Sequence, residues 1–302
     1  MSSVDNDLYL NAAGQSALLQ WAEDHRRAFP WRETRDPWQV LVSEVMLQQT
    51  QAARVVERFE RFVERWPDPS CLASEPLAEV LRFWQGLGYP RRAKNLHLAA
   101  ELIVSRFSGK VPSTIDDLLS LPGVGQYTAR AVMVFAYEET VGVVDTNVGR
   151  LLARWSGSSM KPNQAQQVAD ALVAPSRSWE WNQGLFDLAA TVCLKRGPRC
   201  ASCPVQNWCV WSIDGCPEPD PAVGSAGASA TQARFAESDR DYRGRILRAL
   251  EIPNQSETRP GRSTLAEEAG LSADLTRFDR LCLGLERDGL LTREGVSWRL
   301  GN

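Results

Sequence analysis

The stretch LLSLPGVGQYTARAV, residues 118–132, joins two helical patterns through a turn that contains two glycines. Gly123 and Gly125 allow a tight backbone turn, and they leave the N–H groups of the next helix without side-chain cover. A phosphate can bind at such a helix N-terminus. One interpretation is therefore a helix-hairpin-helix that binds a DNA phosphate, and the other is an ordinary turn between two helices.

Helical patterns extend in both directions from this turn, from Ser16 to Trp211. In the clearest one, apolar residues recur three and four positions apart from Val55 to Trp66, and Pro67 ends the pattern. Strand patterns are nearly absent, so we expect an all-α body. Similar stripes occur at residues 96–107, 115–121, 129–136, 148–155 and 165–173.

The chain has 302 residues, of which 43% are hydrophobic and 24% charged. The length predicts two domains. The composition is that of a folded protein and excludes a disordered chain, a collagen-like fibre and a disulfide-dense miniprotein. No segment has the roughly 18 consecutive apolar residues of a membrane helix, and residues 1–10 lack the pattern of a secretory signal. We therefore expect a cytoplasmic protein with no membrane partner.

The net charge of −3 gives no overall attraction to nucleic acid. A local basic patch does exist, because six Lys or Arg and one acid lie between Arg82 and Lys110. On charge alone this patch is either a solvated helix face or a set of phosphate contacts.

The composition changes after Cys216. Residues 217–232 are rich in Pro, Ala, Gly and Ser, which predicts a flexible linker that we extend to residue 234. Helical patterns then follow at residues 242–251, 265–269 and 275–287, before two short strands within residues 290–300. This order predicts a small winged-helix-like module at residues 235–302.

Four of the seven cysteines lie close together with the spacing C-x6-C-x2-C-x5-C. They are Cys193, Cys200, Cys203 and Cys209. In a reducing cytosol such a group indicates a metal site rather than disulfides. Four thiolates suit either zinc or a [4Fe-4S] cluster, and the spacing alone does not choose between them. We interpret Cys71, Cys216 and Cys282 as buried or incidental thiols.

Two carboxylates stand in unusual places. Glu44 lies on an apolar stripe with Val40, Leu41 and Leu47, and burial favours the protonated form that a general acid needs. The alternative is a buried glutamate paired with an arginine such as Arg32. Asp145 follows an apolar run at the start of a helix, so it is first an N-cap. A carboxylate fixed there can also face a cation that develops in a cleft.

Taken together, the segments SEVMLQQT (43–50), GLGY (86–89), LPGVGQYTA (121–129), VDTNVGR (144–150) and the cysteine group form a specific combination. Over residues 16–212 the chain resembles the MutY-type adenine DNA glycosylases of the helix-hairpin-helix superfamily. The resemblance implies a catalytic domain at 1–216, with a hairpin-containing subdomain at about 36–140. It also implies an iron–sulfur subdomain from 1–35 and 141–216, with a [4Fe-4S] cluster on the four cysteines.

The resemblance further implies roles for individual residues. Glu44 would protonate adenine at N7, and Asp145 would stabilise the oxocarbenium ion at C1′ from the opposite wall of one cleft. Tyr127 and Asn147 would orient these carboxylates and the sugar. The residues expected to contact the base or the DNA are Arg32, Leu47, Gln49, Thr50, Tyr89, Gly123 and Gly125.

Within this set, Gln49 would be the wedge beside the estranged base, Tyr89 the aromatic that enters the stack, and Thr50 a contact to the opposite purine. The basic residues from Arg91 to Lys94 would then contact phosphate. Tyr127 stands where endonuclease III-type enzymes have a lysine that attacks C1′, so we expect base removal without efficient strand cleavage.

We therefore predict a monomeric, nucleoid-associated repair enzyme that removes adenine opposite 8-oxoguanine or guanine in double-stranded DNA. Gln48-Gln49 and GLGY favour adenine over the alternative, a thymine glycosylase for G·T mismatches. A non-catalytic iron–sulfur DNA-binding protein is a further alternative, against which the presence of both Glu44 and Asp145 argues. Residues 235–302 do not resemble the Nudix-type domain with which longer MutY proteins read 8-oxoguanine, so the partner of this module is left open.

Overall fold

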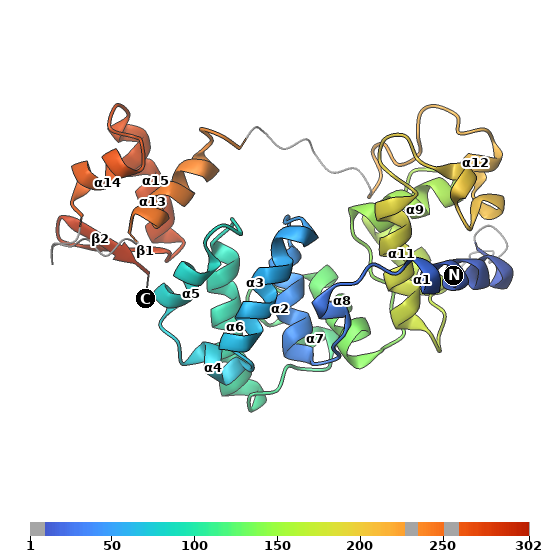
Figure 1. The fold of residues 1–302 in the computed structure, drawn as a ribbon, viewed down its shortest axis with the longest axis horizontal. Coiled ribbons are helices and arrows are strands. Elements are labelled where there is room, and N and C mark those ends of the chain that lie inside the picture. The colour runs from blue at the N-terminus through green and yellow to red at the C-terminus, as the bar shows by residue number, and fades with distance from the viewer. Residues whose placement is uncertain (1–9, 227–234, 251–259, 302) are drawn as a thin grey trace. The chain divides into compact units, whose positions relative to one another are not determined.

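The computed structural model describes residues 10–226, 235–250 and 260–301. These residues are mainly helical, as expected, and the only sheet among them is a two-stranded hairpin (Figure 1). The α-helices before the predicted linker are α1 Ala12–His25, α2 Pro37–Leu47, α3 Ala52–Arg65, α4 Pro69–Ala73, α5 Leu77–Trp84, α6 Arg91–Phe107, α7 Ile115–Leu119, α8 Gln126–Tyr137, α9 Thr146–Ser156, α10 Pro162–Leu172, α11 Ser178–Thr191 and α12 Val210–Ile213. The short 3-10 helices are η2 Pro30–Arg32, η3 Cys200–Ser202 and η4 Gln206–Trp208.

The chain divides into two compact units. The first unit contains residues 1–40, 113–115 and 125–231, and the second contains residues 41–112, 116–124 and 232–302. The predicted subdomain limits at 35/36 and 140/141 stay a prediction. The two compact units differ from the predicted limits because α8 lies in the first unit, and because residues 235–250 and 260–301 lie in the second.

The core of the first unit forms between α1, α9, α10 and α11. Its largest buried side chains include Trp155 and Trp181, which pack with leucines of α1 and α11. These helices come from distant parts of the sequence, so α1 is built into the same core as the helices that follow residue 145. The non-polar surface that they remove from water is the main source of the stability of this unit.

The core of the second unit contains an aromatic group from α3 and α5. The ring of Phe62 lies 4.7 Å from that of Trp66, and the ring of Trp66 lies 5.0 Å from that of Phe83. Offset and edge contacts of this kind are favourable between aromatic rings. The predicted helix from Val55 to Trp66 is confirmed, because α3 ends at Arg65 with Trp66 as its C-cap.

The C-terminal module consists of α13 Asp239–Ala249, α14 Arg262–Glu268, α15 Leu275–Arg287 and the hairpin of β1 Leu291–Glu294 with β2 Ser297–Leu300. The order of three helices and a hairpin agrees with the expectation. Gly295 supplies the positive φ of 62° that the tight turn requires. Residue 251, the last of the first helix expected in this module, lies outside the described residues.

Residues 217–226 differ from the expectation of a flexible linker. Asp220 forms an ion pair of 2.6 Å with Arg154 of α9, and the N–H of Ala226 donates to the carbonyl of Met160 at 2.9 Å. Trp211 also donates to the carbonyl of Pro217 at 2.8 Å. This part of the segment is fixed because a buried arginine needs its carboxylate. Residues 227–234 lie outside the described residues.

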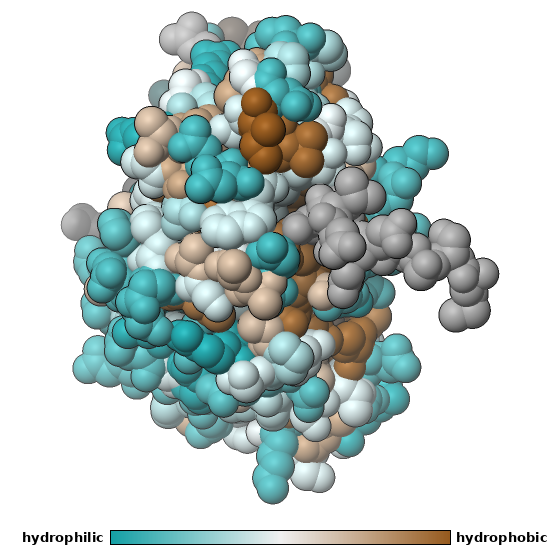
Figure 2. Space-filling model, turned by 90° about the vertical axis from the view of Figure 1, so that its right-hand side faces the viewer, coloured by the Kyte–Doolittle hydropathy of each residue, from teal (hydrophilic) through white to brown (hydrophobic). Residues whose placement is uncertain are grey.

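The face shown in Figure 2 is largely hydrophilic, with small separate hydrophobic groups. Within the described ranges, no helix combines the length and the apolar character needed to cross a membrane.

Candidate functional site

Asp145 is the N-cap of α9, as predicted. Its Oδ1 accepts hydrogen bonds from the N–H groups of Asn147 at 2.8 Å and Val148 at 2.7 Å, and its Oδ2 accepts one from the Asn147 side chain at 2.7 Å. The carboxylate is half-buried, and Asn147 is exposed. These three donors at the start of the helix hold the carboxylate in a fixed orientation.

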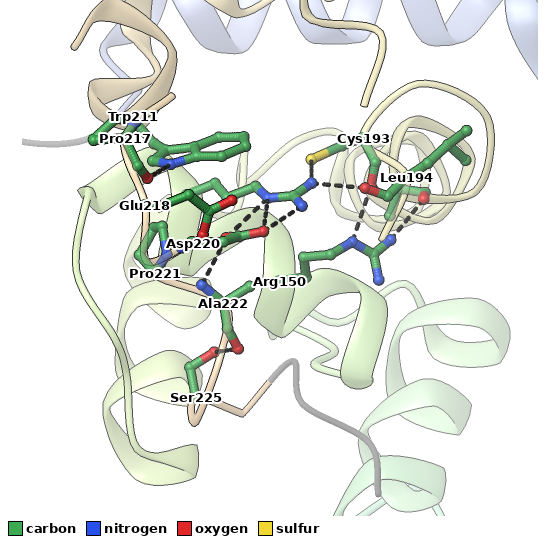
Figure 3. A network of polar contacts seen from close by, with 12 residues as sticks. Arg150, Cys193, Leu194, Trp211, Pro217, Glu218, Asp220, Pro221, Ala222 and Ser225 are labelled. Atoms are coloured by element: carbon green, nitrogen blue, oxygen red, sulfur yellow. Dashed lines mark hydrogen bonds and ion pairs between the residues drawn. The ribbon is translucent and has the colours of Figure 1, made fainter. Parts of the chain in front are cut away.

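Arg150 continues this arrangement toward the cysteines. Its Nη1 donates to Oδ1 of Asn147 at 3.1 Å, and its Nε donates to the carbonyl of Cys193 at 2.9 Å (Figure 3). Burial lowers the pKa of Arg150 from its ordinary value. Arg150 is not among the residues predicted for the site, although its position three residues after Asn147 places both side chains on one helix face.

The four predicted cysteine ligands line one cavity in the first unit. Burial raises the pKa of Cys203 to about 12 and that of Cys209 to about 11, so these thiols need a metal to become thiolates near neutral pH. Within the described residues, no three His, Cys, Asp or Glu side chains converge closely enough to hold a single metal ion. Four thiols around one cavity are a donor set that suits zinc or an iron–sulfur cluster.

Arg154 lies beside this cavity and is 1% exposed. Its Nη1 donates to Sγ of Cys193 at 3.2 Å and to the carbonyl of Leu194 at 2.8 Å. Asp220 accepts from its Nε and Nη2, and this pairing raises the pKa of Arg154 even though burial opposes the charged form. The result is a positive charge that is directed at one of the predicted ligands and is held by Asp220, from the segment that follows the cysteines.

Arg32 is 6% exposed, and its guanidinium forms two hydrogen bonds with Asp187 of α11, at 2.8 and 3.0 Å. Arg27 binds the same carboxylate at 2.6 Å. This buried group braces η2 against α11. The base-pocket role of Arg32 stays a prediction, and the carboxylate that it binds in the structure is Asp187.

Glu44 lies in α2 and is 6% exposed. The apolar residues of its predicted stripe, Val40 and Leu41, are 1% and 0% exposed. The expected burial of Glu44 is therefore confirmed. Glu44 belongs to the second unit, and Asp145 to the first.

The glycine turn has the geometry expected of a helix-hairpin-helix. Gly123 has a φ of 81°, and a Cβ at this position would lie 2.8 Å from Cβ of Asn95, so both the backbone conformation and the space require glycine. Gly125 is the N-cap of α8 and is exposed. Because Gly125 has no side chain, the first N–H groups of α8 are accessible to an anion. Tyr127 lies half-buried in this first turn.

Two residues expected to enter the DNA stack share an unusual backbone conformation. Gln49 has a φ of 55° and Tyr89 a φ of 49°, in the left-handed region that residues other than glycine rarely adopt. Gln49 is exposed, and Leu47, Thr50 and Tyr89 are half-buried. Strain at such positions persists only where the surrounding contacts hold it.

Arg92 supplies those contacts. Its guanidinium donates to the carbonyls of Met46 and Gln48 at 2.8 and 2.6 Å, and to Oγ1 of Thr50 at 3.0 Å. It also donates to the carbonyls of Leu87 and Gly88 at 3.1 and 3.0 Å. One buried side chain thus joins the end of α2 to the loop that carries Tyr89.

In the basic stretch from Arg91 to Lys94 the cations have partners within the chain, and their phosphate contacts stay a prediction. Arg92 is 8% exposed and burial lowers its pKa to about 10, while Lys94 donates to the carbonyl of Asp288 at 2.7 Å. Arg91 lies 3.9 Å from the carboxylate of the same residue. The roles of Arg92 and Lys94 could not be predicted from the sequence, because the carbonyls of α2 and of Asp288 lie far from them along the chain.

Residues 42–175 match the family model of the HhH-GPD superfamily base excision DNA repair proteins. The chain is 43% identical over 287 residues to the adenine DNA glycosylase of Mycobacterium tuberculosis. The aligned region covers 91% of this chain and 89% of that protein. The chain belongs to the MutY-type adenine DNA glycosylase family. The corresponding protein of Mycolicibacterium smegmatis is 41% identical and covers 91% of each chain.

Solved structures agree with this family. A thermostable thymine-DNA glycosylase superposes with a TM-score of 0.64 and 30% identity, and covers 66% of this MutY-type chain and 95% of its own. A trapped endonuclease III–DNA intermediate superposes with a TM-score of 0.58 over 67% of this chain and 95% of its own. Because the two sequences are only 22% identical, this similarity supports the fold alone. The chain is thus a DNA glycosylase of base excision repair, with the helix-hairpin-helix fold.

Proposed function

We propose that this glycosylase removes adenine mispaired with 8-oxoguanine or guanine from double-stranded chromosomal DNA, as a monomer in the cytoplasm. The observation that carries the proposal is the Asp145 carboxylate, whose two oxygens accept three hydrogen bonds at the start of α9. A fixed anion of this kind stabilises positive charge that develops on a deoxyribose. The relatives with identities of 41–43% that cover nine tenths of the chain are named adenine rather than thymine glycosylases.

The two carboxyls have opposite tasks in this mechanism. Glu44, which is buried, donates a proton to N7 of adenine and makes the base a better leaving group. Asp145 remains ionised and stabilises the oxocarbenium ion at C1′ until water attacks. Asn147 holds Asp145 in position, and Tyr127 orients the sugar. Arg32 acts at the border of the base pocket.

Adenine must leave the duplex before this chemistry, at a cost of a few kcal/mol. In the proposal Gln49 fills the space of the extruded base, Tyr89 stacks beside it, and Thr50 contacts the opposite purine. The turn at Gly123 and Gly125 binds a backbone phosphate with the N–H groups of α8. Leu47 completes the contact at the end of α2.

We further propose that Cys193, Cys200, Cys203 and Cys209 hold a [4Fe-4S] cluster. The support is the set of four thiols around one cavity and the guanidinium of Arg154 directed at Cys193. When bound, the cluster would cross-link residues 193–209 and fix their loop. A sample that contains stoichiometric zinc and no iron, after both aerobic and anaerobic preparation, would reject this assignment.

The test of the function is a panel of duplexes with A or T opposite 8-oxoguanine or guanine, scored for alkali-labile sites under single-turnover conditions. We expect cleavage at A in both contexts. Cleavage at T alone would instead support the thymine glycosylase, whose fold the chain shares.

The variant Glu44→Gln should lose excision but keep mispair binding, because an amide cannot supply the proton. The matched control is Glu57→Gln, a change in a side chain of α3 that is 82% exposed. Equal rates for Glu44→Gln and wild type would remove Glu44 from the mechanism.

A further inference from the structure

We propose that the C-terminal module positions Tyr89 through Arg240, and so helps to determine how tightly the enzyme binds a mispair. Arg240 is then a positioning residue, supplied by a part of the chain to which the sequence assigned no partner. The inference rests on the proposed function, because it takes Tyr89 as the side chain that enters the DNA stack.

The contact lies within the second unit, between α13 and the loop that precedes α6. Nη1 of Arg240 donates a hydrogen bond of 2.5 Å to the hydroxyl of Tyr89. The same guanidinium lies 5.4 Å from the centre of the Tyr89 ring and 4.9 Å from that of Phe235, which is 55% exposed. Arg240 therefore holds both the polar end and the ring of Tyr89.

A second contact joins the C-terminal module to the first turn of α6, which follows Pro90 in the sequence. The carbonyl of Asp288, just after α15, accepts from Lys94, and its carboxylate binds Arg243 of α13. Arg91 lies 3.9 Å from the same carboxylate. Asp288 thus connects the first turn of α6 with the helix that carries Arg240, so the position of Arg240 is set by more than its own side chain.

The loop that carries Tyr89 needs external support. Gly86 and Gly88 have φ values of 84° and 74°, and Tyr89 itself is in the left-handed region. Arg92 holds the carbonyls of Leu87 and Gly88, and its guanidinium lies 5.5 Å from the centre of the Tyr89 ring. Arg92 and Arg240 therefore restrain Tyr89 from two elements of the structure, the start of α6 and the C-terminal module.

A side chain that is already ordered loses less rotamer entropy when it inserts into DNA. Removal of Arg240 should therefore weaken binding of the mispair by about two- to tenfold. The effect should be larger for a mispair than for a matched duplex, because only the mispair complex requires insertion of Tyr89. A mere loss of phosphate attraction would weaken both duplexes equally.

The test uses the full-length, cluster-loaded protein and duplexes in which a 2′-fluoro-adenosine replaces the target and blocks cleavage. Dissociation constants for A·G and matched duplexes are measured for wild type, Arg240→Ala, Tyr89→Phe and the double variant. We expect Arg240→Ala to weaken A·G binding selectively, with a smaller change in the single-turnover rate at saturating enzyme. In the Tyr89→Phe background, which lacks the acceptor hydroxyl, the Arg240→Ala change should have less effect.

The matched control is Arg262→Ala, another arginine of the module, which pairs with Asp279. Hydrogen exchange of the backbone amides of residues 86–89 in the DNA-free protein gives a readout independent of catalysis. The exchange should rise in Arg240→Ala and not in the control. Unchanged exchange together with unchanged or tighter A·G binding overturns the inference. A wild-type enzyme that removes no adenine overturns the proposed function instead, and the exchange measurement still decides whether Arg240 restrains Tyr89.

Discussion

The side chain of Asn147 donates a hydrogen bond of 2.7 Å to Oδ2 of Asp145, while the backbone N–H of the same residue donates to Oδ1. One residue thus binds both oxygens of the carboxylate and fixes its plane. Arg150 in turn binds Asn147 and the carbonyl of Cys193. The orientation of Asp145 is therefore connected, through two side chains, to the first of the cysteines.

We predict that Asp145→Asn reduces excision at least about 100-fold, because the neutral amide cannot stabilise an oxocarbenium ion. An asparagine still caps a helix, so folding and mispair binding should be retained. Single-turnover rates and dissociation constants measure the two effects. The matched control is Asp68→Asn, a change in another N-cap aspartate, at α4. Wild-type rates in Asp145→Asn would refute its role.

The wild-type enzyme should not be trapped on DNA by borohydride, because Tyr127 has no amine that can form a Schiff base with C1′. Tyr127→Lys places a lysine in the first turn of α8, and a trapped protein–DNA band should then appear on a denaturing gel. Tyr127→Phe is the control and should give no band. Robust trapping of wild type would show that the enzyme is not monofunctional.

Arg92→Met should lower the free energy of unfolding by about 3 kcal/mol, because buried carbonyls at the end of α2 and in the Tyr89 loop lose their donor. Denaturation by urea measures this change. The neighbouring Arg91→Met is the control, since the Arg91 side chain is 71% exposed and the change should stay within about 0.5 kcal/mol. Equal stabilities for the two variants would contradict the role of Arg92.

Asp220→Asn should destabilise the first unit by about 3 kcal/mol near neutral pH, because it leaves the buried Arg154 without a counterion. Burial raises the pKa of Asp220, but the hydrogen bond from Arg154 outweighs this effect, so the pKa lies below its ordinary value of 3.8. Its stabilisation is therefore present above pH 3.8 and is lost as the pH falls below that value.

The stability difference between wild type and Asp220→Asn should accordingly shrink in acid, which urea denaturation at several pH values measures. The exposed Asp214→Asn is the control and should match wild type throughout. The visible absorption of the proposed cluster should decay faster in Asp220→Asn. A stability difference that is independent of pH would show that the ion pair is not the cause.

Several parts of the site followed from local sequence. The N-cap role of Asp145 and the turn at Gly123 depend on a few adjacent residues, and the burial of Glu44 follows from the period of its helix. The helix order of the C-terminal module was predictable for the same reason. In each of these cases the interacting residues lie within about one helical turn of each other in the sequence.

The sequence by itself determined which segments are helical, where the glycine turn and the candidate cysteine ligands lie, and, through resemblance, the enzyme family. Only the tertiary structure decided the partners of the arginines: Asp187 for Arg32, Asp220 for Arg154, the carbonyls of two loops for Arg92, and Tyr89 for Arg240. An arginine can bind any acceptor that it reaches. Which acceptor it reaches depends on how helices distant in the sequence pack, and burial of the guanidinium then makes that one partner necessary.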